Sequence, residues 1–111
     1  MITLDALRSF GANVDEGLSR CMNNEAFYLR LVGMAAADSG FSELSAALEK
    51  NDLKAAFEAA HKLKGVFANL SLTPLFTPAS ELTELLRNGT PGDYDSLLSE
   101  ILRQKALLEA L

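Results

Sequence analysis

Several residue types that build recognisable sites are scarce in this chain. Cys21 is the only cysteine, which excludes an internal disulfide and argues against a zinc site built on cysteines. No stretch of 18 apolar residues is free of charge, so we expect no membrane span. The basic-then-apolar pattern of a signal peptide is also missing, since Asp5 stands almost at the start. Together these features predict a cytoplasmic protein.

Positive charge is also in short supply. Ten Lys and Arg residues stand against fifteen Asp and Glu residues, which gives a net charge of −5. General nucleic-acid binding needs a basic stripe that displaces counterions, and the largest basic cluster here is Lys62 with Lys64. We therefore expect neither a nucleic-acid partner nor a membrane partner.

The composition that remains is that of a helical protein. Hydrophobic residues make up 49 % of the chain, Leu and Ala dominate, and glycine and proline fall mostly between periodic segments. We predict an all-α fold, an up-and-down four-helix bundle with short N-terminal helices packed as a lid. One domain is expected over residues 1–111, with the lid over 1–22 and the bundle over 24–110. Because this arrangement starts at Met1, we expect a free-standing form. We also expect the protein to be a monomer.

Capping residues predict where several helices begin. Thr3, Asn24 and Asp52 each precede an apolar-periodic segment, and their side-chain oxygens suit the N-cap position. The helix after Asp52 is expected to reach about residue 70.

Other expectations depend on packing. We expect Met22 to face inward, and Phe27 and Met34 to belong to the apolar stripe of the next helix. Pro78 would remove a backbone hydrogen bond from a helix interior, so the regular part of its helix is predicted to start near Thr77.

His61, the only histidine, lies in the middle of the helix predicted after Asp52. At about 100° per residue, the core stripe of this helix consists of Leu53, Ala56, Ala60, Leu63, Phe67 and Leu70. His61 falls on the exposed flank with Lys64 and Gly65 beside it, whereas Lys62 points elsewhere.

These three neighbours suit phosphoryl chemistry. Glycine in a helix interior costs about 1 kcal/mol relative to alanine, so Gly65 calls for a reason. Helical side chains lean toward the N-terminus, so a side chain at position 65 would cover His61, and glycine leaves that space empty. Lys64 leans toward the same ring and offers a mobile charge for a phosphoryl group. We predict that His61 is the phosphoacceptor, with Lys64 as electrostatic support and Gly65 as steric clearance.

Each residue also has an ordinary explanation. A lone histidine in a helical protein is most often a surface or packing residue, a glycine can mark a close helix contact, and lysines are usually solvated charges. Their presence on one helix face, with no second histidine, favours the phosphoacceptor interpretation.

The run from His61 to Gly65 resembles the active-site helix of histidine phosphotransfer (HPt) domains. That family's motif is an acceptor histidine followed by a hydrophobic residue two positions on, a lysine three on and a glycine four on, and Leu63, Lys64 and Gly65 match it. The run 81–86 is similar to the family's next helix, and the order of helices fits nearly the whole chain. The resemblance implies a four-helix-bundle phosphocarrier of a two-component phosphorelay.

The resemblance also implies how the site works. Nε2 of His61 would accept a phosphoryl group from a response-regulator receiver aspartate or a hybrid histidine kinase and pass it onward. The chain would need no cofactor of its own, with Mg²⁺ expected in the partner receiver domain. It would be a phosphocarrier rather than an enzyme, because no glycine-rich nucleotide motif is present.

Some family members hold the other ring nitrogen with a polar side chain on the next helix. An ungapped reading gives that position to Thr83, with Ser80 one turn earlier. Ser71, where the family often has glycine, departs from the pattern.

The residues that flank His61 on its helix are predicted to bind the partner: Lys54, Phe57, Glu58, Ala68 and Asn69. Lys54 adds a second positive charge two turns before His61. For Phe57, the edge of the bundle core is an equally good interpretation. A transient signalling contact of this kind buries less than about 1,200 Å².

Three other functions stay open. A sensor-kinase dimerisation and phosphoacceptor helix is one, although such helices usually have an acidic residue where Lys62 stands. A non-catalytic helical adaptor is the second. A haem or metal site through His61 is the third and weakest, because no second ligand lies four residues on.

Overall fold

In the computed structural model, the structure describes residues 2–111. Met1, the first residue of the predicted lid, lies outside the described residues. Within them the protein consists of seven helices and no strand: α1 (Leu4–Phe10), α2 (Val14–Arg20), α3 (Glu25–Ala36), α4 (Gly40–Glu49), α5 (Leu53–Asn69), α6 (Thr73–Arg87) and α7 (Tyr94–Glu109). The predicted all-α helical bundle is confirmed.

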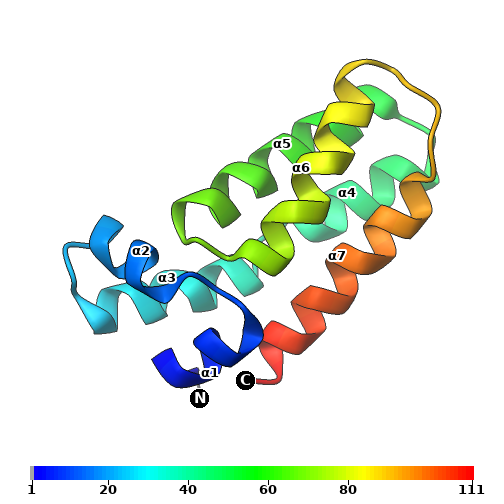
Figure 1. Ribbon diagram of the computed structural model, residues 1–111. Helices are drawn as coiled ribbons and strands as arrows, with labels where there is room; N and C mark the ends of the chain where they lie inside the picture. The colour runs from blue at the N-terminus through cyan, green and yellow to red at the C-terminus, as the bar shows by residue number, and fades with distance from the viewer. Residues whose placement is uncertain (1) are drawn as a thin grey trace.

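Helices α4 to α7 form the body of the molecule. α5 packs against both α4 and α6, α6 packs against α7, and α7 returns to contact α4 and α3. The four helices α4 to α7 run in alternating directions, and α3 continues into α4 along one side of the molecule (Figure 1). Between them lies a core of fully buried side chains that includes Leu44, Leu63, Phe67, Leu75, Leu82 and Ile101.

The predicted N-caps are confirmed. Oγ1 of Thr3 accepts a hydrogen bond from the Ala6 N–H at 3.1 Å, and Oδ1 of Asn24 accepts one from the Phe27 N–H at 3.0 Å. Asp52 caps α5 in the same way. These caps satisfy backbone donors that the first turn of a helix leaves free, so they fix where each helix begins.

Helix α6 begins earlier than expected. The structure starts it at Thr73 rather than near Thr77, with Pro78 inside the helix and buried. Pro78 has no N–H to donate to the Pro74 carbonyl one turn earlier, but its ring is buried in the core. Core packing therefore outweighs the hydrogen bond that Pro78 removes.

The inward face of α3 also differs from the expectation. Tyr28 and Val32 are fully buried, whereas Phe27 is 39 % exposed and Met34 is 62 % exposed. Met22, expected to face inward, is 88 % exposed and lies in the turn before α3. Apolar residues cover more of the α3 surface than the neighbouring helices can bury. The side that carries Tyr28 and Val32 faces those helices, and the side that carries Phe27 and Met34 faces solvent.

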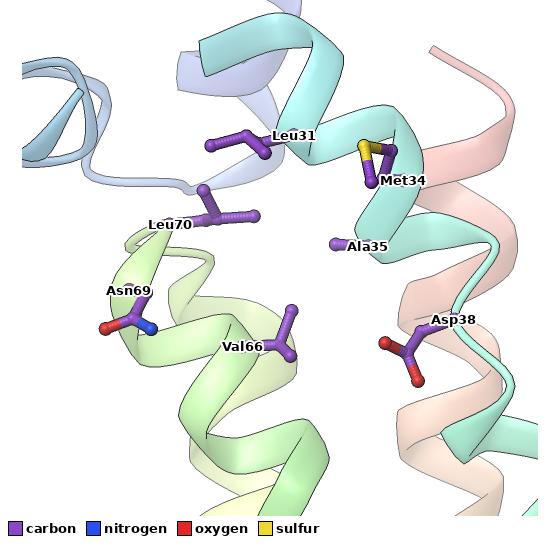
Figure 2. Close-up of a pocket in the computed structure, with 7 residues that line it drawn as sticks. All are labelled: Leu31, Met34, Ala35, Asp38, Val66, Asn69 and Leu70. Atoms are coloured by element: carbon purple, nitrogen blue, oxygen red, sulfur yellow. The ribbon is translucent and has the colours of Figure 1, made fainter. Parts of the chain in front are cut away.

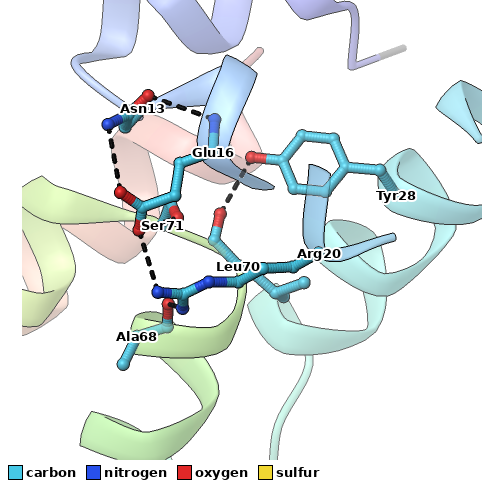
Figure 3. A network of polar contacts seen from close by, with 7 residues as sticks. All are labelled: Asn13, Glu16, Arg20, Tyr28, Ala68, Leu70 and Ser71. Carbon is cyan, nitrogen blue, oxygen red and sulfur yellow. Dashed lines mark hydrogen bonds and ion pairs between the residues drawn. The ribbon is translucent and has the colours of Figure 1, made fainter. Parts of the chain in front are cut away.

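The N-terminal helices are tied to the C-terminal end of α5 (Figure 3). The Tyr28 hydroxyl donates to the Leu70 carbonyl at 2.9 Å, and burial raises the pKa of Tyr28 above its ordinary value. Ser71 Oγ donates to Glu16 Oε1 at 2.8 Å, and Arg20 donates to the Ala68 carbonyl. These bonds hold the end of the helix that carries His61.

None of the helices in residues 2–111 has the length and hydrophobicity that crossing a membrane requires.

Candidate site around His61

His61 stands on the exposed side of α5, two turns past its N-terminal end. The opposite side of the helix is anchored by Ala56, Ala60, Leu63 and Phe67, each of which is fully buried. The imidazole is therefore presented outward by a helix whose core side is fixed on both sides of it. The His61 side chain is thus accessible from solvent on a helix that the core holds in place.

Gly65 leaves the space next to His61 open. A Cβ built at this position would meet no atom within 4 Å, and the residue is exposed. The packing of the folded chain therefore does not require glycine here. No close packing within residues 2–111 offsets the cost of this glycine in helix stability.

The two lysines next to His61 point to different neighbours. Nζ of Lys64 lies 3.8 Å from Oε1 of Glu84 on α6. Nζ of Lys62 lies 3.3 Å from Oδ1 of Asp38 and 3.8 Å from Oε1 of Glu43, near the turn between α3 and α4. The Lys62 charge is thus committed to the other flank of α5.

Aromatic and charged side chains extend the site toward α6. The ring of Phe57 stacks on the imidazole of His61, with 5.7 Å between the centroids and 10° between the planes. Cζ of Arg87 lies 5.1 Å from the Phe57 centroid, and its Nε lies 3.4 Å from Oε1 of Glu84. Because Glu84 also faces Lys64, a chain of contacts runs from His61 through Phe57, Arg87 and Glu84 to Lys64.

A family comparison decides what kind of protein has this site. The family model for the Hpt domain matches residues 33–111, which is more than half of the chain and includes all of α5 and α6. The chain belongs to the Hpt domain family. Hpt domains take part in histidine phosphotransfer within phosphorelays, where they act as phosphocarriers with kinases and receiver domains as partners. Comparisons with curated proteins and with solved structures give no match.

In this Hpt domain, Thr83 lies inside the bundle. Its side chain is fully buried, and its hydroxyl donates to the Ala79 carbonyl at 2.6 Å, within α6. Ser80 is half-buried on the same helix. The hydroxyl proton of Thr83 is therefore used locally, and the role of either residue in orienting the imidazole stays a prediction.

The residues predicted to bind a partner line the outer side of α5 in this Hpt domain. Lys54, Glu58 and Asn69 are exposed, and Phe57 and Ala68 are half-buried. Their distribution follows the helix on both sides of His61.

A groove that the sequence analysis missed continues this surface (Figure 2). It lies between α3 and α5 and is lined by Leu31, Met34, Ala35, Asp38, Val66, Asn69 and Leu70. Asn69 belongs both to the groove and to the predicted partner surface. Glu84 and Arg87 were missed as well, because the way α6 faces α5 depends on how two helices align and not on either helix alone.

Proposed function

We propose that this Hpt domain accepts a phosphoryl group on His61 and exchanges it with the aspartate of a response-regulator receiver domain. A hybrid histidine kinase is the proposed upstream partner. The observation that carries the proposal is an exposed histidine next to a glycine that the folded chain itself does not need. The chain needs no nucleotide for this role, because the phosphoryl group arrives already activated on the partner.

The transfer step balances with groups of ordinary reactivity. The lone pair of the imidazole Nε2 attacks the phosphorus of the partner's aspartyl phosphate, in line with the bond to the carboxylate oxygen. That P–O bond breaks as the P–N bond forms, and the carboxylate leaves with the electron pair. Reversal of the same step returns the phosphoryl group. Positioning and charge stabilisation supply most of the catalysis in such transfers.

Lys64 and Gly65 have separate roles in this proposal. The Lys64 ammonium turns from Glu84 toward the incoming phosphoryl oxygens, and its 3.8 Å separation from Glu84 makes that exchange easy. Gly65 leaves room for the partner to approach the phosphorus along the attack line. The Mg²⁺ ion is expected in the partner receiver domain.

The partner surface is proposed to cover Lys54, Phe57, Glu58, Ala68 and Asn69. The groove beside Asn69 supports a wider surface, because the exposed Met34 adds apolar area there. The monomeric state and the cytoplasmic location stay predictions.

Phosphoramidate, a small donor that phosphorylates imidazoles, tests the proposal directly. We expect the wild-type protein to gain one acid-labile phosphate by intact mass and to lose it to an added receiver domain. The His61→Gln variant should gain none and should keep the helical circular dichroism of the wild type, because the exposed side chain supports no core packing.

Failure of folded wild-type protein to take phosphate at His61 would contradict the proposal and favour the helical adaptor. An obligate dimer in light scattering would favour the sensor-kinase helix instead.

A further inference from the structure

We propose that Phe57 is a positioning residue for phosphoryl transfer, and that it acts by holding the imidazole plane of His61. This inference rests on the proposed function. It gives Phe57 a role within the protein itself, separate from any contact with a partner.

The first observation is the geometry of the stack. Phe57 lies one helical turn before His61, and the two rings are nearly parallel, with 10° between their planes and 5.7 Å between centroids. Offset stacking at this separation is a favourable arrangement for aromatic pairs. An exposed histidine on a helix otherwise exchanges between its rotamers within picoseconds to nanoseconds. The stack restricts the imidazole to one plane relative to α5.

The second observation is that Phe57 is itself held. Its side chain is half-buried at the edge of the bundle core, and the Arg87 guanidinium lies over its ring at 5.1 Å. Arg87 is kept in place by Glu84, whose Oε1 lies 3.4 Å from the Arg87 Nε. The Phe57 ring that stacks on His61 is thus held from α6 by Arg87.

The third step links order to rate. Attack at phosphorus needs the nitrogen lone pair in line with the leaving group, so an imidazole already held in one plane loses less freedom at the transition state. This benefit is independent of donor size. A residue that only docks a partner would instead affect transfer from a protein donor and leave a small donor unaffected.

The test compares phosphoramidate with a phosphorylated receiver domain as donors. Phe57→Leu keeps an apolar side chain without the ring, and Phe57→Tyr keeps the ring. Phe76→Leu is the matched control, since Phe76 is another half-buried phenylalanine of the bundle. It lines a different pocket, together with Asn13 and Ser71, and that pocket does not include His61. Arg87→Gln loosens the Phe57 ring without changing it and serves if Phe57→Leu folds poorly.

With phosphoramidate, we expect Phe57→Leu to lower the maximal rate roughly 3- to 10-fold with KM unchanged. Phe57→Tyr and Phe76→Leu should stay within about two-fold of the wild type, and Arg87→Gln should fall between. The imidazole proton signals of His61 should lose the ring-current shift in Phe57→Leu and keep it in Phe57→Tyr.

Wild-type rates for Phe57→Leu with phosphoramidate would overturn the inference, whether or not transfer from the receiver slows. That outcome leaves the proposed function intact, because His61 still accepts phosphate. Absence of any phosphate on wild-type His61 would instead remove the proposed function and this inference together.

Discussion

At the scale of single residues, we expect a larger side chain at position 65 to stabilise α5 and to restrict access to His61. Glycine is among the worst helix formers, and a Cβ here meets nothing within 4 Å. Gly65→Ala should therefore raise the free energy of unfolding by about 0.5–1 kcal/mol, and Gly65→Gln should also stabilise α5. Urea denaturation followed by circular dichroism measures both.

The same two variants should separate in phosphoryl transfer. The long Gly65→Gln side chain leans over His61 and obstructs a receiver domain more than it obstructs phosphoramidate. Gly65→Ala adds only a methyl group and should stay close to the wild type with both donors. Equal slowing of Gly65→Gln with the small and the large donor would refute the steric explanation.

Lys64 and Lys62 offer a matched pair for charge. Lys64→Gln should shorten the lifetime of phosphohistidine about 3- to 10-fold, because the ammonium beside the phosphoryl group is lost. Lys62→Gln removes the same charge from a side chain paired with Asp38, so its effect should be within about two-fold. The difference should shrink as salt is raised, since the site is exposed. Equal lifetimes in the two variants at low salt would exclude the proposed role of Lys64.

At the scale of elements, the turn between α5 and α6 depends on Ser71. Its φ of 56° is left-handed, where glycine is favoured, yet its hydroxyl donates to Glu16 at 2.8 Å. Ser71→Ala loses the hydrogen bond and keeps the backbone strain, so unfolding free energy should fall by about 1–2 kcal/mol. Ser71→Gly loses the same bond but relieves about 1 kcal/mol of strain, and should be the more stable variant. An alanine variant as stable as the glycine variant, in thermal unfolding, would contradict this account.

The helices show which features a sequence can predict. The caps at Thr3, Asn24 and Asp52 were predictable because each depends on a side chain and a backbone N–H three residues apart. The start of α6 was not, because Pro78 is accommodated by burial that only the folded bundle provides.

In the candidate site, too, features that depend on one helix were predictable and contacts between helices were not. His61, Lys64 and Gly65 lie within one helical turn or so, and the period of the helix alone brings them to one side. The contacts of Glu84 and Arg87 join two helices, so their places beside Lys64 and Phe57 depend on how α6 packs on α5. The stack of Phe57 on His61 was within reach of the sequence, since residues four apart are neighbours on a helix.

At the scale of the whole molecule, the N-terminal helices and the bundle form one continuous packing unit. α1 contacts α7, α2 contacts α3, and Leu7, Val14 and Tyr28 belong to the same buried cluster as the bundle core. The Tyr28 hydroxyl bond to the Leu70 carbonyl links this N-terminal part to the end of α5. We therefore expect residues 2–111 to unfold in a single transition.

A substitution at Gly17 tests whether the chain unfolds in a single transition. A Cβ at position 17 would lie 2.5 Å from Cε1 of Tyr28, a ring that is fully buried and cannot move aside cheaply. Gly17→Ala should lower the free energy of unfolding by about 1–3 kcal/mol, which lowers Tm by several degrees. Gly33→Ala is the control, because a Cβ on α3 at that position meets no atom within 4 Å and should slightly stabilise the helix.

Two signals show whether Gly17→Ala destabilises the whole chain or only the N-terminal helices. If the chain unfolds as one unit, Gly17→Ala shifts the circular dichroism transition and the His61 imidazole signals in NMR to the same lower temperature. Below that temperature, His61 should react with phosphoramidate at the wild-type rate, since α5 and its contacts with α6 are intact. Imidazole signals that keep the wild-type midpoint while the helical signal melts in two steps would mean that the N-terminal helices unfold on their own. In that case the bonds from Arg20 and Tyr28 to α5 would not support the helix that carries His61.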